Sequence, residues 1–522
     1  MGHRLSASNR SQTSSAPKRQ RWEIIVVAAM AMSTVALHPI YYMRHHPYWG
    51  DEAWVAILAR APLRDFIRLS SSSPIGWMTL VRWAPFDLDS LRLISLCFSI
   101  ATIPVAYYVA RSLPWPTLTW SRVAAISAAF IALLAPIALM RSDLKQYTSD
   151  AFLTLVLFGV AARTERRRTP RSWIALVVIS SIALIFSTAT GFVTIAIMGS
   201  FVLNELRQGN DRRLRDPLAA AVVAGTFTVG YFLAVVIPQS NPALRGYWDY
   251  KYLKGNPWNV VSDAWGSLHQ LSEELAMPAL LFVLLVSCGV ATLYRMGQRA
   301  MAIAIPLVWL EMFVAGIARR YPFLDQRTSH FLLVLSFQVA AVGFVGIAAW
   351  IARHHRPLSV GFLVTMTGLF ALGSVPYVHN QSIPLEDVRS QIEYVARNIK
   401  PHDIVIVNYI GRYAFGIYWP NARSSFSTDH TGQNPNGFLT EVTNLRNLVY
   451  ATGRRERHTT PAVRDAVALW RKGPPTATIW LIRNHVQPYE HDAWESSFRQ
   501  IGVTAKLIEL GNEPVAILRP IP

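Results

Sequence analysis

Long apolar segments alternate with short polar ones along roughly the first 380 residues of the chain. Segments such as 91–113, 218–238 and 331–351 each supply roughly 20 nearly uncharged residues, the length that a helix needs to cross about 30 Å of hydrocarbon. The pattern predicts an α-helical polytopic membrane protein. Eleven spans are expected, at approximately 23–39, 91–113, 123–140, 148–162, 173–187, 190–206, 218–238, 277–296, 301–318, 331–351 and 360–378.

The region 173–206 decides the topology. As a single helix it would be about 51 Å long, too long for the bilayer, and the polar residues 187–191 offer a break, so two short spans are predicted. With two passes, the most basic loops fall on one side, which the positive-inside rule assigns to the cytoplasm. These are a disordered tail, 1–22, and the loops 163–171, 207–215, 295–299 and 353–356. The N-terminus is therefore expected inside and the C-terminus outside.

Composition agrees with a membrane protein. The 522 residues are 52% apolar and carry a formal net charge of +19. The Lys and Arg residues cluster in short segments between apolar runs, so the charge follows membrane topology and no nucleic-acid partner is expected. The only cysteines of the sequence, Cys97 and Cys288, lie within apolar runs. Neither a disulfide framework nor a cysteine metal site is therefore expected.

The tail, 379–522, has a different pattern. Apolar residues recur at helical spacing over 388–399, and a strand-like segment, 404–407, follows. Further helices are predicted at 462–470 and 493–501, and further strands at 478–482, 505–510 and 515–518. This alternation predicts a small extracytoplasmic α/β domain of about 140 residues. The outer side would also hold the loops 40–90, 141–147, 239–276 and 319–330.

The first outer loop carries adjacent carboxylates, Asp51 and Glu52, among aromatic residues. Acidic groups near the membrane plane are costly to desolvate and often have a function. One could be a general base toward an acceptor hydroxyl, and the pair could hold a divalent cation such as Mg²⁺ or Mn²⁺. A solvated loop with Asp51 as helix N-cap is the alternative.

Two outer loops carry cations against the positive-inside bias, which suggests an anionic partner such as a lipid phosphate. The candidates are Lys145, Arg141, Arg319, Arg320 and Arg327. Snorkelling of Lys145 and Arg141 to headgroups is the alternative in one loop, and in the other a salt bridge from Asp325 would neutralise one arginine. Three histidines, His45, His46 and His330, lie near these clusters, but their spacing matches no specific metal site.

Three motifs together resemble the GT-C glycosyltransferase superfamily, which includes the protein O-mannosyltransferases and the lipid A aminoarabinose transferase. They are Gly50-Asp51-Glu52-Ala53-Trp54, Leu144-Lys145-Gln146-Tyr147-Thr148-Ser149-Asp150, and Tyr321-Pro322-Phe323 followed by Arg327. The bacterial branch related to the Rhizobium lipopolysaccharide core transferases is the most similar, and 386–409 resembles the opening of its outer domain. The resemblance covers nearly the whole chain.

The resemblance implies a transfer of a monosaccharide from a polyprenyl-phosphate donor to a cell-envelope acceptor, a glycan, lipid or protein, outside the membrane. Asp51 would be the catalytic carboxylate, with Glu52 assisting or binding metal. Lys145 and the loop arginines would bind the donor phosphate, and the donor and acceptor would be lined by Trp54, Tyr147, Asp150 and Tyr321. One departure is Ser71-Ser72-Ser73-Pro74-Ile75-Gly76, where many relatives have a His-Pro-Pro-Leu-type sequence; acceptor or metal handling would then differ.

Three other functions compete with this one. A transporter or flippase for a lipid-linked saccharide would place ionisable groups near mid-membrane and show related halves, whereas here the charges gather at outer ends of spans. A glycan ligase using a diphosphate-linked lipid would also use outer arginines. A noncatalytic scaffold would have no need of Asp51 and Lys145.

The topology can be tested by cysteine labelling from outside intact cells. A Ser424→Cys variant should label with an impermeant maleimide, because the tail is expected outside, and an Arg167→Cys variant should stay protected. Protection of residue 424 together with labelling of residue 167 would reverse the predicted orientation.

Overall fold

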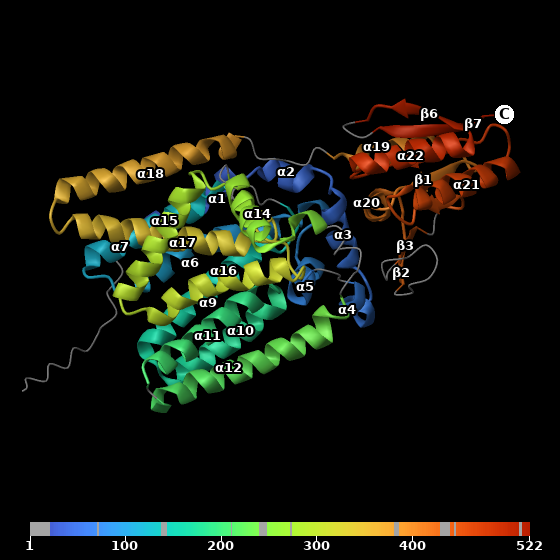
Figure 1. The fold of residues 1–522 in the computed structure, drawn as a ribbon. Coiled ribbons are helices and arrows are strands. Elements are labelled where there is room, and N and C mark those ends of the chain that lie inside the picture. The colour runs from blue at the N-terminus through green and yellow to red at the C-terminus, as the bar shows by residue number, and fades with distance from the viewer. Residues whose placement is uncertain are drawn as a thin grey trace, which may run out of the picture.

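The computed structural model describes residues 21–69, 73–136, 143–209, 211–239, 248–271, 274–379, 386–427, 439–442, 445–510 and 514–521. Long helices run side by side in a bundle, and an α/β domain lies at one end of it (Figure 1). The long helices are α1 (Arg21–Leu37), α6 (Leu93–Ser112), α7 (Leu118–Leu134), α9 (Tyr147–Arg167), α10 (Pro170–Phe186), α11 (Thr190–Arg207), α12 (Asp211–Tyr231), α15 (Ala279–Arg295), α16 (Arg299–Ile317), α17 (His330–Ile351) and α18 (Arg356–His379).

The bundle is that of a membrane protein. Within the described residues, five helical segments are long and apolar enough to span a bilayer: Leu88–Ser112, Arg213–Val236, Arg299–Ile317, His330–Ile351 and Arg356–Val378. α17 is almost wholly buried at the centre, whereas most of the apolar surface of α18 is exposed, as a lipid-facing helix requires. Each of the eleven expected spans lies on a long helix; the count of eleven crossings stays a prediction.

Close backbone contact joins α15 to α17. A Cβ atom at Gly343 would come within 2.1 Å of the carbonyl oxygen of Leu285, and one at Gly289 within 2.0 Å of the carbonyl oxygen of Val339. Small residues permit this approach, which is how helices pack in lipid, where apolar side chains gain little by leaving the hydrocarbon. The central helix is thereby fixed against its neighbour.

The predicted break in 173–206 is confirmed, because α10 ends at Phe186 and α11 begins at Thr190. The Ser187 hydroxyl accepts a hydrogen bond from the Thr190 amide at 3.3 Å, and the Thr190 hydroxyl donates to the Ser187 carbonyl at 2.7 Å. These bonds satisfy backbone groups that the end of one helix and the start of the next leave open. The chain can therefore reverse direction between two short helices.

The four loops predicted on the outer side meet at one end of the bundle. The first holds α2 (Ile40–His45), α3 (Gly50–Leu58), α4 (Phe66–Leu69) and α5 (Ile75–Trp83), and the third holds α14 (Pro257–Gln270). Gln239 donates to the Ser73 carbonyl at 3.4 Å, and the Phe323 amide donates to the Lys251 carbonyl at 3.1 Å. The loops thus form one layer between the bundle and the α/β domain (Figure 1).

The α/β domain contains a five-stranded sheet in the order β4-β1-β5-β7-β6. β4, β1 and β5 are parallel, and β7 and β6 continue the sheet antiparallel. Most of the expected helices and strands occur near their predicted places; the small helix after β1 and the strands β2, β3 and β4 were not expected. The elements are α19 (Val388–Asn398), β1 (Ile404–Val407), α20 (Gly411–Tyr418), β2 (Ser424–Ser427), β3 (Leu439–Val442), β4 (Leu448–Tyr450), α21 (Glu456–Lys472), β5 (Ile479–Ile482), α22 (Pro488–Ile501), β6 (Val503–Ile508) and β7 (Val515–Pro520).

Both faces of the parallel strands are covered, which explains their unbroken apolar sequence. Ile404 and Ile406 pack with α21 and α22, whereas Val405 and Val407 pack with α19 and α20. The second of these cores continues into the first outer loop, where it includes Trp77. The domain and the outer loops therefore share one hydrophobic core.

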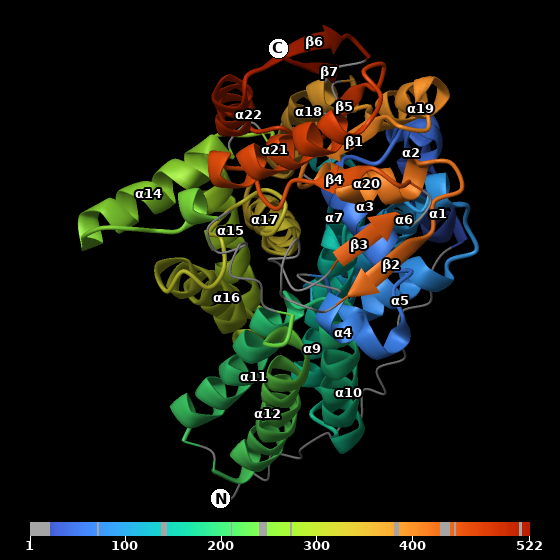
Figure 2. The same ribbon diagram turned by 90° about the vertical axis from the view of Figure 1, so that its right-hand side faces the viewer.

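Specific contacts fix this docking. α20 lies beside α3 (Figure 2), and a Cβ atom at Gly50 would come within 2.2 Å of Ile410. The Tyr48 amide donates to the Tyr418 hydroxyl at 2.9 Å. Because Gly50 has no side chain, Ile410 of the domain can pack directly against the start of α3.

Candidate active site

The candidate site lies where the outer loops meet the α/β domain, around Asp51. Asp51 is in the first turn of α3, whose N-cap is Trp49, so Asp51 is not the cap that the alternative interpretation expected. Its carboxylate pairs with the Arg327 guanidinium at 3.3 Å, and 25% of its side chain remains exposed. Asp51 therefore has a cationic partner and is still accessible to a substrate.

Four cations act on Asp51. Burial alone would raise the pKa of Asp51, but Lys145, Arg327, His485 and Arg454 outweigh it and hold that pKa below its ordinary value. Lys145 is 6% exposed, and its burial lowers the pKa of its ammonium in spite of the nearby Asp51. The carboxylate is therefore ionised at neutral pH.

Aromatic side chains frame these charges. The Arg327 guanidinium lies 5.2 Å from the Trp248 ring centre and 6.0 Å from that of Trp49, and the Lys145 ammonium lies 5.4 Å from that of Trp54. Tyr413 of α20 stacks on Trp54 at 5.9 Å. Cation–π contacts of this kind orient the cations without neutralising them, which leaves their charge available to an anion.

Glu52 has a different environment from Asp51. It is fully buried and accepts two hydrogen bonds from Arg92, at 2.7 and 2.5 Å, and one from the Leu144 amide at 2.7 Å. Arg92 also donates to the carbonyls of His46 and Pro47, at 2.6 and 2.9 Å. Both oxygens of Glu52 are thus occupied by Arg92 and by the backbone of the loop that carries Lys145. Glu52 therefore has a structural role here, whereas Asp51 faces Arg327.

The remaining predicted phosphate ligands are placed less favourably. Arg319 and Arg320 are exposed at the end of α16, and neither is among the cations that act most strongly on Asp51. Arg141 lies outside the described residues. Of the five candidate cations, the structure therefore brings Lys145 and Arg327 to the carboxylate.

The predicted lining residues divide into two groups. Trp54 contacts Lys145. The buried Tyr147 lies close enough to Arg327 and Asp51 for their charges to act on its hydroxyl. Asp150 lies one helical turn further along α9 and is buried next to Ser187. Tyr321 lies near both Asp150 and Tyr147. Asp150 therefore belongs to the wall behind the site.

The three histidines lie in different surroundings. His45 and His46 lie against Tyr41 and Tyr42, and His330 is buried at the start of α17. Within the part of the chain that the structure describes, no group of three or more His, Cys, Asp or Glu side chains is arranged to hold a metal ion.

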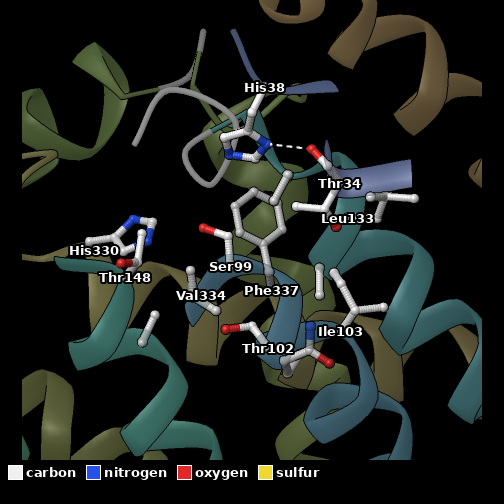
Figure 3. Close-up of a pocket in the computed structure, with 14 residues that line it drawn as sticks. Thr34, His38, Ser99, Thr102, Ile103, Leu133, Thr148, His330, Val334 and Phe337 are labelled. Carbon is white, nitrogen blue, oxygen red and sulfur yellow. Dashed lines mark hydrogen bonds between the residues drawn. The ribbon is translucent and has the colours of Figure 1, made fainter. Parts of the chain in front are cut away.

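A small cavity lies behind the site, inside the bundle. Figure 3 shows His330 beside Thr148 and His38 hydrogen-bonded toward Thr34, to whose carbonyl its Nδ1 lies at 2.8 Å. The space open to the centre of a water molecule is about 20 Å³, enough for roughly one water. The cavity is too small for a sugar or a lipid chain.

Sequence reasoning missed the residues that the α/β domain supplies. His485 lies 5.3 Å from Trp49, ring centre to ring centre, and its Nδ1 bonds to Glu386 at 2.6 Å. Burial lowers the pKa of His485, but Glu386 and then Asp51 outweigh burial, and the net pKa is raised. The signal was a run of polar residues directly after an apolar strand, because parallel strands carry their binding residues at the carboxyl ends.

Comparison with solved structures identifies the architecture. ArnT from Cupriavidus metallidurans in the apo state superposes with a TM-score of 0.54 at 15% identity, over 95% of this chain and 97% of that one. Archaeal oligosaccharyltransferase AglB from Archaeoglobus fulgidus, in complex with an inhibitory peptide and a dolichol-phosphate, gives 0.51 at 12%, over 88% and 69%. Both are GT-C glycosyltransferases.

The chain has the GT-C fold. The same archaeal enzyme in a complex with Zn and sulfate also matches, with a TM-score of 0.51 at 13% identity, over 87% of this chain and 67% of that one. No family model and no curated protein matches the sequence. At this level of identity the likeness establishes the GT-C fold, and the chemistry has to be argued from the site.

The Glu52–Arg92 pair can be tested by stability. Glu52→Gln leaves the Arg92 charge buried without a counter-ion, so the protein in detergent should lose roughly 3–5 kcal/mol of unfolding free energy. Asp89→Asn is the control, since its ion pair with Arg389 is more than one-third exposed and should contribute at most about 1 kcal/mol. Equal melting of Glu52→Gln and wild type would contradict the assignment.

Proposed function

We propose that the protein is a membrane glycosyltransferase that transfers a monosaccharide from a polyprenyl-phosphate donor to a cell-envelope acceptor at the extracytoplasmic face. The observation that carries this proposal is the grouping of Asp51 with Lys145 and Arg327. A candidate base and two cations meet at the end of a membrane bundle, where a lipid headgroup and a water-soluble acceptor can both reach. A flippase or a noncatalytic scaffold would require no such grouping.

The donor phosphate would bind between Lys145 and Arg327. Lys145 supplies a compact ammonium from a nearly buried position, and Arg327 supplies a planar guanidinium whose fork matches phosphate oxygens. Fixed cations in a site shielded from water stabilise the charge that develops on a leaving phosphate.

Asp51 would be the base. It accepts the proton of the acceptor hydroxyl while the hydroxyl oxygen bonds to the anomeric carbon and the bond from that carbon to the phosphate oxygen breaks. The lipid phosphate leaves as an anion, and direct displacement inverts the anomeric configuration. The proton ends on Asp51, and the electron pair of the broken bond leaves on the phosphate oxygen.

The charges around Asp51 suggest an order of binding. In the free enzyme Lys145 and Arg327 lower the pKa of Asp51, which makes it a weak base. A phosphate bound between these cations would counter their field, and the pKa of Asp51 would rise. Asp51 would then become an effective base only when the donor is in place, which protects the donor from premature attack.

The comparisons support the class of donor. The archaeal oligosaccharyltransferase that shares this fold was solved with a dolichol-phosphate. A polyprenyl phosphate therefore has a precedent on this architecture.

Asp51→Asn tests the base. The amide keeps the size of the carboxylate but cannot accept the proton, so turnover of a polyprenyl-phosphate sugar should fall by about 10²-fold or more. Donor binding and expression should be preserved. Near wild-type turnover would remove Asp51 from the reaction and would leave Asp143 and Asp150 as the next candidates.

Lys145→Ala and Arg327→Ala test the donor site. Each should weaken undecaprenyl-phosphate binding by roughly 1.5–3 kcal/mol, the cost of losing a charge-assisted hydrogen bond. Arg320→Ala is the matched control, because Arg320 is on the same loop as Arg327 but is exposed. If both variants bind the lipid as tightly as the control does, the phosphate lies elsewhere.

A further inference from the structure

The carboxyl ends of the parallel strands in the α/β domain face the catalytic loops. β1, β4 and β5 end at Val407, Tyr450 and Ile482, and at most five residues separate each strand from the helix that follows it, α20, α21 or α22. In sheets of this kind ligands bind outside the carboxyl ends, where the strand order reverses. Here the order β4-β1-β5 reverses at β1, so the edge between β1 and β5 is the expected position.

Polar groups concentrate at this edge. Asn408 follows β1 and is fully used: its amide nitrogen donates to the Asn484 carbonyl at 2.8 Å and to Glu490 at 3.0 Å, and its oxygen accepts from the Gly411 amide at 2.9 Å. Asn484 follows β5 and is also fully buried. Among the described residues, neither its side-chain oxygen nor its nitrogen has a hydrogen-bond partner. A buried amide of this kind calls for a partner from outside the chain.

Cations lie at the same edge. Arg454 follows β4 and is 13% exposed; its nearest carboxylate oxygen, on Glu490, is 3.7 Å away, beyond hydrogen-bond distance. His485 follows β5 and is 17% exposed; its Nδ1 lies 2.6 Å from Glu386 and its Nε2 lies 3.2 Å from the side-chain amide of Gln487. The amino ends of three helices add positive potential here, which favours an anion.

The edge and the catalytic carboxylate belong to one space. Arg454 and His485 are among the four cations that act on Asp51, although they come from the other domain. Asp51 and Arg327 are partly exposed, as are Arg454 and His485. Partly exposed charged groups thus lie on both sides of the domain boundary, where the ring centres of His485 and Trp49 are 5.3 Å apart.

We propose that this strand edge is an acceptor-binding subsite, and that it takes a saccharide with an acidic group, a carboxylate or a phosphate. Arg454 binds the acidic group beside the charge of His485, the Asn484 amide meets a neighbouring hydroxyl, and a further hydroxyl of the same molecule reaches Asp51. The subsite rests on the proposed function, since it orients an acceptor toward the donor. It also explains why the α/β domain is docked on the catalytic loop.

The test uses the full-length protein in nanodiscs and three probes: methyl glucuronide, glucose 6-phosphate and neutral methyl glucoside. Saturation-transfer NMR titrations should show binding of an acidic probe at least about tenfold tighter than binding of methyl glucoside. The acid that binds more tightly identifies the carboxylate or the phosphate as the group recognised. Equal binding of all three probes, or no binding, would overturn the proposal.

Variants assign the binding to this edge. Arg454→Gln and His485→Gln should each weaken binding of the acidic probe by about tenfold, whereas Arg471→Gln, at the opposite end of α21, should leave it unchanged. Acidic-probe binding that survives both substitutions would place the subsite elsewhere. Thermal melting of each variant shows that the fold is retained.

Undecaprenyl-phosphate binding separates this proposal from the preceding one. If the lipid binds wild type and no acidic saccharide does, the subsite is wrong and the glycosyltransferase assignment stands. If an acidic saccharide binds through Arg454 and His485 but the lipid does not bind at all, the donor assignment fails while the saccharide site is real.

Discussion

The buried pair of Glu52 and Arg92 organises the outer face of this protein. Arg92, at the start of α6, holds the carbonyls of His46 and Pro47 together with both oxygens of Glu52. Glu52 in turn holds the Leu144 amide, next to Lys145. Two loops that are far apart in sequence are thus fixed to one helix end. A buried ion pair is costly unless its hydrogen bonds are complete, and here the surrounding carbonyls and amide complete them.

Asp51 depends on this arrangement, because its own surroundings are assembled from four parts of the chain. Lys145 is placed by Glu52, Arg327 comes from the loop before α17, and Arg454 and His485 come from the α/β domain. Three of these cations also lie against a second carboxylate: Asp325 for Arg327, Glu490 for Arg454 and Glu386 for His485. The fold therefore holds a cluster of both signs of charge around Asp51, because a buried charge is costly without a counter-charge.

The α/β domain is part of the same unit as the bundle. Its core is continuous with that of the first outer loop, and Ile410 fills the space that Gly50 leaves open. The carboxyl ends of its parallel strands consequently face the loop that carries Asp51. The candidate site therefore has the loops at the end of the bundle on one side and the α/β domain on the other.

The sequence by itself determined the membrane class, the helix break near Ser187, most of the tail elements, and Asp51, Lys145 and Arg327 as charged residues outside the spans. Apolar run length and charge bias are local properties, so they can be read along the chain. The resemblance favoured Asp51 over Glu52, but the residues alone gave no physical reason for it, because adjacent carboxylates look alike until a helix turns them about 100° apart. Only the tertiary structure decided that Glu52 binds Arg92, that Arg319 and Arg320 stay exposed, and that His485 and Arg454 join the site. These depend on contacts between residues tens to hundreds of positions apart, which no local pattern records.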